Sequence, residues 1–412
     1  MTASLKGMNA LKKQNVTFSY AVITAFFWMT FCIAIAYTAD YLQNMGFSDT
    51  EVGLIMAAGN LSGACIAPVL GGLCDRKRNL TTFSFFAPLT ILKAVCLTVL
   101  LISGGRGIVT AVAYGAYIAF SIPVNTLNLK ICIDYERAGC PLNYGLARGC
   151  GSLGFVLISS LLGVTIEKIG YATLPVAGLL LLIPESVMQA ATDRRIRALR
   201  NEMNADMQTA PLVKSSSMIG FIRENKRFTV FLLGSFLIFY THNIDTNFLI
   251  NLTRSVGGGS QEMGFISSFT AVCELPALML FSRFLSRYRT DRLMRISLVM
   301  FVVKTAAYTF APTVPVLFVS RLLQCPSYAL YTAATVPYVK SVINDKDAAR
   351  GQSLAFTMTT AGSVAASVIG GRLYDLYSVR TVMLIALAVC TAGVLIAVAG
   401  TEDKKRPSPA KL

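Results

Sequence analysis

An apolar block at residues 51–73 ends in the charged stretch Gly71-Gly72-Leu73-Cys74-Asp75-Arg76-Lys77-Arg78. The paired glycines allow a second helix to approach closely, and Asp75 can cap the end of a neighbouring helix. The cations that follow favour the cytoplasmic side of a membrane. The stretch is therefore typical of a short inside loop between two membrane-spanning helices.

The composition of the whole chain points to the same class of protein. Of its 412 residues 54% are hydrophobic and only 14% are charged, and the mean hydropathy is +0.59. A soluble domain of this size could not expose so much apolar surface to water. A β-barrel would show alternating segments of about ten residues, whereas these apolar blocks do not alternate. We expect an all-α integral membrane protein.

Twelve apolar blocks approach the roughly 20 residues that a helix needs to cross about 30 Å of hydrocarbon. We expect spans at residues 16–39, 51–73, 80–103, 107–133, 146–166, 171–190, 227–251, 262–284, 292–311, 314–338, 352–373 and 379–400. The first block is too long for a signal-peptide core, and no small-residue cleavage site follows it. It is expected to be retained as a helix.

Lysine and arginine crowd into alternate connections between these blocks, which places those connections and both termini in the cytoplasm. The net charge of +16 follows mainly from this asymmetry. Attraction to anionic lipid headgroups is a secondary consequence, and no nucleic-acid partner is needed to explain the charge. We therefore expect a multi-pass protein of the cell (plasma) membrane.

The apolar pattern stops between Ala190 and Asn225. We expect an N-terminal six-helix bundle at 1–190, a cytoplasmic linker at 191–226, a second six-helix bundle at 227–400 and a cytoplasmic tail at 401–412. The halves look related, because Ala147-Arg148-Gly149 opens the fifth block and Ala349-Arg350-Gly351 opens the eleventh. Two related halves suggest alternating access around a central site.

The chain has ten cysteines and one histidine. The cysteines are scattered without CxxC spacing and suit small packing positions, so we expect no metal site. With a single histidine, no nucleotide-binding loop and no nucleophile elbow, the sequence also argues against an enzyme.

The stretch at 71–78 resembles the loop motif G-x-x-x-D-R of the major facilitator superfamily, which Gly71, Asp75 and Arg76 match here. Over nearly its full length the chain is similar to the lactose permease type of sugar/proton symporter. The matching features, in order, are Phe47-Ser48-Asp49-Thr50, Tyr144-Gly145-Leu146-Ala147-Arg148, Phe155, Asp245, Glu274, Lys304 and Arg321. The resemblance implies twelve transmembrane helices in two pseudo-symmetric bundles. It also implies a monomer that uses the proton gradient, and no cofactor, to move a small molecule.

The resemblance implies that Arg148 hydrogen-bonds substrate hydroxyls and that Phe155 stacks on the sugar ring. A spacing of seven residues puts both on one helical face. Alternatively, Phe155 packs in the core or against lipid and Arg148 reaches the headgroups. The carboxylate that faces this arginine in the family aligns with Lys130. This reversed charge disfavours a neutral disaccharide and favours an organic or sugar acid.

The resemblance also pairs Asp245 with Arg321. A second family ion pair aligns with His242 and Thr359, so both of its charges are missing together, as pairing physics requires. The only histidine then lies one helical turn before Asp245. It is either a pH-sensitive relay or a hydrogen-bonded polar residue at an aqueous cavity.

The family's proton-carrying histidine and glutamate of the tenth span align with Gln324 and Ser327, neither of which titrates. Glu274 is the leading alternative, because desolvation in an apolar run favours the protonated form of a carboxylate. It could instead form a fixed salt bridge to Lys304, which matches the family's cation of the ninth span. His242 and Asp245 are the second candidates for the proton.

The sequence thus predicts a proton-coupled symporter that imports a sugar or a small organic or sugar acid by alternating access. Substrate would lie between Arg148, Phe155 and Lys130 on one side and Glu274 on the other. An exporter of small amphipathic compounds with the same fold is the alternative.

Overall fold

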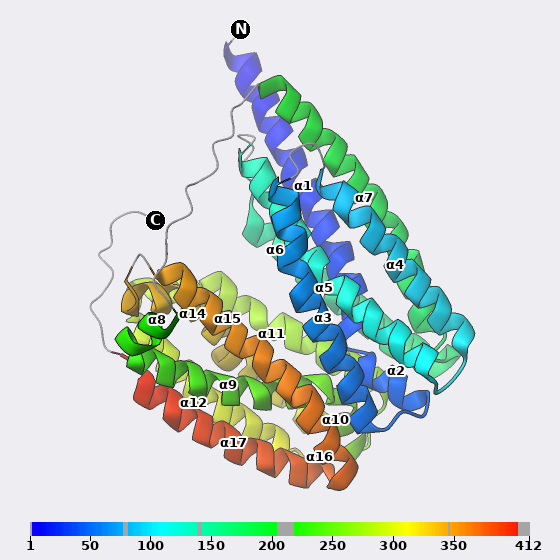
Figure 1. Cartoon of the computed structure of the whole chain (residues 1–412), viewed down its shortest axis with the longest axis vertical. Coiled ribbons are helices and arrows are strands. Elements are labelled where there is room, and N and C mark those ends of the chain that lie inside the picture. Colours follow the sequence, from blue (N-terminus) through cyan, green and yellow to red (C-terminus); the bar gives the residue numbers. More distant parts are fainter. Residues whose placement is uncertain (1, 77–80, 138–141, 204–217, 345–346, 403–412) are drawn as a thin grey trace. The chain divides into compact units, whose positions relative to one another are not determined.

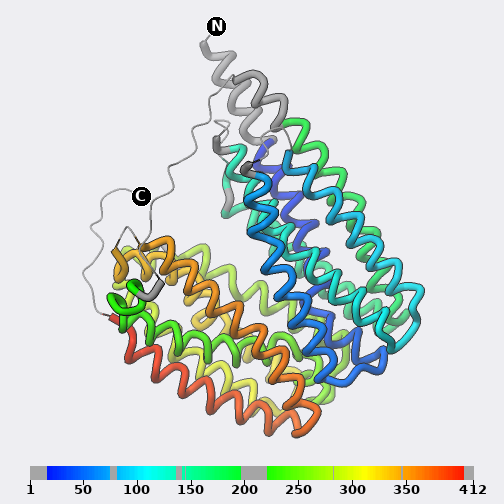
Figure 2. Tube along the Cα trace, in the orientation of Figure 1, coloured from blue at the N-terminus to red at the C-terminus, as the bar shows by residue number. Residues whose placement is uncertain are grey.

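The computed structural model describes residues 2–76, 81–137, 142–203, 218–344 and 347–402 (Figure 1). The described residues are helical apart from short turns and connections. They divide into two compact units, which Figure 2 traces from blue to red along the chain. Unit 1 comprises residues 1–47 and 54–209, and unit 2 comprises residues 48–53 and 210–412.

The helices of the first half have the following bounds: α1 Thr2–Ile35, α2 Thr38–Asn44, α3 Asp49–Arg76, α4 Thr82–Ser103, α5 Ile108–Arg137, α6 Tyr144–Ile169 and α7 Thr173–Met203. Helix α7 continues past residue 190 into the expected linker. The added stretch contains four arginines and two alanines, which favour helix even where the apolar pattern stops.

The second half contains α8 Met218–Glu224, α9 Lys226–Asn247, α10 Leu249–Ser255, α11 Ser260–Arg287, α12 Thr290–Thr309, α13 Val314–Ser320, the 3₁₀ turn η1 Arg321–Gln324, the π turn η2 Cys325–Ala329, α14 Leu330–Val342, α15 Ala348–Ala365, the π turn η3 Ala366–Gly370, α16 Gly371–Leu376 and α17 Val379–Gly400. Two of its expected spans, the tenth and the eleventh, therefore contain turns of non-α geometry.

Ten helices in the described ranges are long and apolar enough to cross a membrane. The other two expected spans fall on α12 and on the segment from α13 to α14. Helix α12 carries Asp291, Arg292, Arg295 and Lys304, and the α13–α14 segment is divided by η1 and η2. The charges of α12 and the division of the α13–α14 segment thus explain why these two expected spans are not among the ten.

The two units repeat the same packing scheme. In unit 1, α1 packs against α6 and α7, and α4 packs against α5 and α7. In unit 2, the helices of the corresponding spans form the same pairs: α9 packs against α15 and α17, and α12 packs against α14 and α17. This repetition is the pseudo-symmetry expected from the related halves of the sequence.

The core of unit 2 is rich in aromatic side chains from α9, α12 and α14. Phe231 stacks on Tyr331 with ring centroids 6.3 Å apart, and Phe239 meets Tyr331 at 5.0 Å. All three rings are buried. Because helices in lipid associate through close packing and not through exclusion of water, such interlocking rings hold α9 in place.

Helices α9 and α17 approach each other closely at Gly234. A Cβ added there would lie 2.5 Å from the carbonyl oxygen of Gly393 and closer still to the backbone nitrogen of Ala397. Neither backbone atom can move without shifting its helix. Glycine at this position therefore sets the distance between the two helices.

We predict that Gly234→Ala lowers the midpoint of thermal unfolding of the purified protein, with a cost of roughly 1–3 kcal/mol from overpacking. Gly72→Ala is the matched control, because nothing lies within 4 Å of a Cβ added there. That control should be neutral or slightly stabilising. An unchanged midpoint for Gly234→Ala would contradict the close approach of α9 and α17.

Candidate functional site

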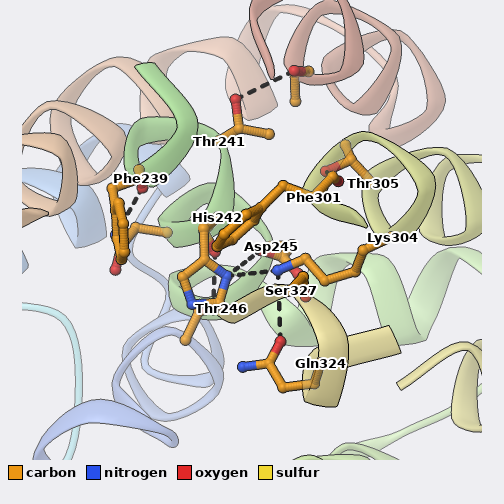
Figure 3. Close-up of polar contacts among 12 residues, drawn as sticks. Phe239, Thr241, His242, Asp245, Thr246, Phe301, Lys304, Thr305, Gln324 and Ser327 are labelled. Atoms are coloured by element: carbon orange, nitrogen blue, oxygen red, sulfur yellow. Dashed lines mark hydrogen bonds and ion pairs between the residues drawn. The ribbon is translucent and has the colours of Figure 1, made fainter. Parts of the chain in front are cut away.

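Unit 2 contains a buried cluster of ionisable and polar side chains drawn from four helical elements. His242 and Asp245 come from α9, Lys304 from α12, and Arg321 and Gln324 from η1 (Figure 3 labels all of these except Arg321). All five side chains are buried. Glu274 of α11 adds a half-buried carboxylate. Charged groups at this depth are costly unless they compensate one another.

The interruption of the tenth span brings η1 into this cluster. Pro326 lies in the π turn directly after η1 and has no N–H to continue the helical ladder. Insertions of 3₁₀ and π geometry change the direction of the side chains on a helix and often occur at functional sites. Here Arg321 and Gln324 point to the cluster from the two ends of η1.

Lys304 and His242 form the shortest contact of the cluster, with 2.8 Å between Lys304 Nζ and His242 Nδ1 (Figure 3). An ammonium group can only donate hydrogen bonds, so a charged Lys304 donates to Nδ1. The histidine is then neutral and carries its ring proton on Nε2. Asp245 Oδ1 lies 3.6 Å from the same Nδ1, which is beyond hydrogen-bond distance.

Arg321 forms an ion pair with Asp245, at 3.3 Å between Nη1 and Oδ2. The guanidinium also lies 4.0 Å from the centre of the Tyr308 ring, in a cation–π arrangement. Its Nε and Nη2 are buried and have no hydrogen-bond partner among the described residues. The structure thus brings together the two residues that the resemblance pairs.

Gln324 lies between Lys304 and Glu274. Its Oε1 is 3.5 Å from Lys304 Nζ, and its Nε2 donates to Glu274 Oε1 at 3.0 Å. The amide therefore connects the carboxylate to the ammonium group, in place of the direct salt bridge considered from the sequence. A change in the charge of Glu274 would therefore affect the hydrogen bond that Gln324 accepts from Lys304.

Sequence reasoning missed the aromatic wall of the cluster. The His242 ring lies 4.7 Å from Tyr328 and 5.9 Å from both Phe239 and Phe301, centroid to centroid. Phe301 also faces Lys304 Nζ at 4.9 Å. Their spacing in the sequence could have indicated these rings. Phe239 lies three residues before His242 and Phe301 three residues before Lys304, in each case on the same helical face.

Of the predicted substrate residues of unit 1, Phe155 shares its neighbour Trp28 with Arg148 of α6. The Arg148 guanidinium carbon lies 4.0 Å from the ring centre of Trp28 of α1, and its Nη1 donates to Ser152 Oγ at 3.1 Å. Phe155 meets Trp28 edge to face at 6.5 Å. Trp28, the only tryptophan of the chain, was not predicted from the sequence. Among the described residues, no carboxylate forms an ion pair with Arg148.

Lys130 of α5 has a carboxylate partner within its own helix. Its Nζ lies 3.8 Å from Asp134 Oδ1, one turn further along, and both side chains are about one-fifth exposed. The reversed charge noted in the sequence is therefore partly offset locally. Lys93 of α4, another cation of unit 1, is fully buried and paired with Glu185 of α7.

The loop motif is described only in part. Gly71 lies in α3, and its added Cβ would meet only the Thr126 side chain at 3.7 Å. The side chains of Asp75 and Arg76 lie outside the described residues. The capping role of Asp75 and the inside location of Arg76 therefore remain predictions. No group of three or more histidine, cysteine, aspartate or glutamate side chains in the described ranges is arranged to hold a metal ion.

The Asp245–Arg321 pair gives a direct test of the cluster's energetics. We predict that Asp245→Asn and Arg321→Gln each destabilise the purified protein by about 3–5 kcal/mol, because each leaves one buried charge without its partner. The double variant should lose clearly less than the sum of the two. Thermal unfolding of the wild type, the two single variants and the double variant completes this double-mutant cycle. If the two single losses of stability add up to the loss in the double variant, the pair does not interact.

Comparison with known proteins agrees with this architecture. A model of the "MFS_1 like family" matches residues 18–385. A probable 3-phenylpropionic acid transporter of Escherichia coli (strain K12) is 22% identical, over 85% of this chain and 89% of its own length. A maltose permease of Geobacillus stearothermophilus is 21% identical, over 96% of each chain.

Among solved structures, the nucleoside transporter NupG superposes with a TM-score of 0.79 at 16% identity, covering 95% of this chain and 100% of its own. At that identity the superposition shows the fold alone. The family match covers most of the chain and does not depend on any one relative. The protein is thus a multi-pass member of the MFS_1 like family of the major facilitator superfamily, a family of membrane transporters and not of enzymes.

Proposed function

We propose that this transporter is a proton-coupled symporter that imports a small organic or sugar acid. The observation that carries the proposal is the 2.8 Å contact between Lys304 and His242 within the buried cluster of unit 2. We further propose that it resides in the plasma membrane with both termini in the cytoplasm, as the alternation of basic connections indicates.

The contact supports coupling because two bases at this distance share one proton. A second proton would create two cations side by side in a low-dielectric interior, where their repulsion is strong. Lys304 would then move toward Gln324, which lies beside it, and toward Glu274, to which Gln324 donates a hydrogen bond. A proton taken from outside and released inside would in this way change the contacts of three helices during each cycle.

Glu274 is the member of the cluster best placed to bind the transported proton. It is only half-buried, whereas Asp245 is almost fully buried and held by Arg321. Protonation of Glu274 would remove one negative charge from the neighbourhood of Lys304 and weaken the hold on that ammonium group. Release of the proton would restore it.

The Arg148 group supports an acidic substrate. A guanidinium that is stacked on Trp28 and bonded to one serine hydroxyl keeps most of its N–H groups for another acceptor. A carboxylate can bind such a fork in a bidentate manner. Trp28 and Phe155 would cover the ring of the substrate. The names of the two relatives, one of an aromatic acid transporter and one of a sugar permease, are compatible with this class.

Reconstituted proteoliposomes test the proposal with matched probes. We expect 3-phenylpropionate and glucuronate to accumulate when the outside is made acidic, and 3-phenylpropanol and maltose not to. Accumulation of maltose alone would overturn the acid preference, and uptake that ignores the pH gradient would overturn proton coupling. If proteoliposomes loaded with a probe instead expel it against its own concentration gradient when the outside is acidic, the protein is an exporter.

We predict that Arg148→Gln weakens the apparent affinity for the transported acid by roughly 10- to 100-fold, because a charge-assisted hydrogen bond is lost. Trp28→Leu should weaken it for aromatic acids more than for sugar acids. Leu157→Ala on the same helix is the control, since the Leu157 side chain is 63% exposed. Equal effects of Arg148→Gln on acids and alcohols would argue against a carboxylate contact.

We predict that Glu274→Gln abolishes accumulation driven by the pH gradient but preserves exchange of substrate across the membrane, because exchange needs no net proton movement. Thr305→Val, next to Lys304 on α12, should retain both activities. Labelled uptake and counterflow measure the two activities separately. A Glu274→Gln protein that still accumulates substrate against a gradient would remove Glu274 from the coupling mechanism.

A further inference from the structure

Unit 1 contains a second buried charge pair that the proposed mechanism does not use. Lys93 Nζ of α4 lies 3.4 Å from Glu185 Oε2 of α7, and both side chains are fully buried. Thr30 of α1 donates to the same oxygen at 3.2 Å. The other carboxylate oxygen, Glu185 Oε1, is also buried and has no hydrogen-bond partner among the described residues.

Lys93 corresponds in position to Lys304. They lie on the third span of the first half and the third span of the second half, and both are fully buried. The helices that carry them, α4 and α12, also pack against corresponding partners, α7 and α17. Each unit therefore buries one lysine on the equivalent helix, although the groups that face the two lysines differ.

Stability alone does not account for the Lys93–Glu185 pair. Apolar side chains of similar volume in place of a buried ion pair usually leave a protein equally stable or more stable. Ionisable residues inside a membrane bundle commonly belong to an ion or proton pathway and do not serve stability alone. The unused oxygen of Glu185 is a place where a proton can bind.

A row of buried polar side chains leads from Glu185 along α7. Gln189, Thr192 and Asp193 follow at helical spacing on the same face, and all are buried. Gln189 donates to Asn128 of α5. The Nδ2 of Asn128 and the Oγ1 of Thr192 are, like Glu185 Oε1, buried without a hydrogen-bond partner in the described structure.

Unsatisfied polar atoms in an apolar interior are the places where proteins hold internal water. One helical turn advances about 5.4 Å along the axis, a distance that a single water can bridge with two hydrogen bonds. Asp193, at the far end of the row, accepts a bond from the backbone N–H of Phe83 at 3.4 Å. Water along this face would connect Glu185 with the polar end of α7.

We propose that Glu185 is a proton-binding site in unit 1, supplied by water molecules held along the polar face of α7. The proton passes from water to Glu185 Oε1, Lys93 keeps its own proton, and unit 1 gains one positive charge. This charge would favour an anionic substrate bound in the same unit, and that consequence rests on the proposed proton-coupled function.

The titratable groups that face Glu185 are few. Lys93 approaches Glu185 from α4. Tyr117 of α5 interacts electrostatically with Glu185. The Tyr117 hydroxyl donates its hydrogen bond to the carbonyl of Thr30 on α1. From α6, which also packs on α7, no charged side chain contacts Glu185 among the described residues. A pH response of the site would therefore report mainly on Glu185 and Lys93.

Infrared difference spectroscopy of the reconstituted protein tests this site without a substrate. Spectra between neutral and acidic pH should contain a carbonyl band of a buried carboxylic acid that the double variant Lys93→Met/Glu185→Leu lacks. The double variant removes both charges together, so neither is stranded. Glu274→Gln and Thr90→Val, one turn before Lys93, should retain the band. Gln189→Leu should slow its appearance after a pH jump.

Glu185→Asp keeps the pair and guards against a double variant that does not fold. It should shift the buried carboxylic-acid band without removing it. A folded double variant with the wild-type spectrum, or an unshifted band in Glu185→Asp, would overturn the proposal. Failure of proton-driven uptake in the wild type would instead overturn the proposed function, and the infrared result would be unaffected.

Discussion

A charge inside a membrane bundle must be compensated, and this constraint organises both units of the protein. In unit 2 it joins Lys304, His242, Asp245 and Arg321 into one cluster. In unit 1 it pairs Lys93 with Glu185. Because removing one member would strand the others, each charge holds its neighbouring helices in register. In unit 2, the aromatic packing between α9 and α14 holds the helix that carries His242 and Asp245 in place.

The cluster of unit 2 depends on the irregular tenth span. A continuous α-helix through residues 321–329 would present Arg321 and Gln324 in different directions from those of η1 and η2. The turn geometry allows Arg321 to meet Asp245 while Gln324 reaches both Lys304 and Glu274. The irregular helix geometry and the proposed proton coupling thus coincide at one place, where a small change of charge can reposition side chains on α9, α11 and α12.

Much of this architecture could be predicted from the sequence. Hydropathy and charge asymmetry indicated twelve spans, because the bilayer imposes a fixed length and the inside face collects cations. The matching stretches Ala147-Arg148-Gly149 and Ala349-Arg350-Gly351 indicated two related halves. The resemblance to the lactose permease type paired Asp245 with Arg321, in agreement with the requirement that buried charges be compensated. The sequence could not indicate the stacking of Trp28 on Arg148, the bridging position of Gln324 or the pairing of Lys93 with Glu185. These contacts depend on which helices become neighbours and on the break in the helix at Pro326. The periodicity of the sequence within one helix indicates neither of them.

A proton shared by Lys304 and His242 within the buried cluster can be observed directly. The chain has one histidine, so nuclear magnetic resonance of protein labelled with ¹⁵N-histidine reports on this site alone. If the two residues share one proton, the His242 ring is neutral at neutral pH without substrate and carries its proton on Nε2. The Nδ1 signal should then change in Lys304→Met, which removes the donor. A ring protonated on Nδ1, or a spectrum that Lys304→Met leaves unaltered, would contradict the shared proton.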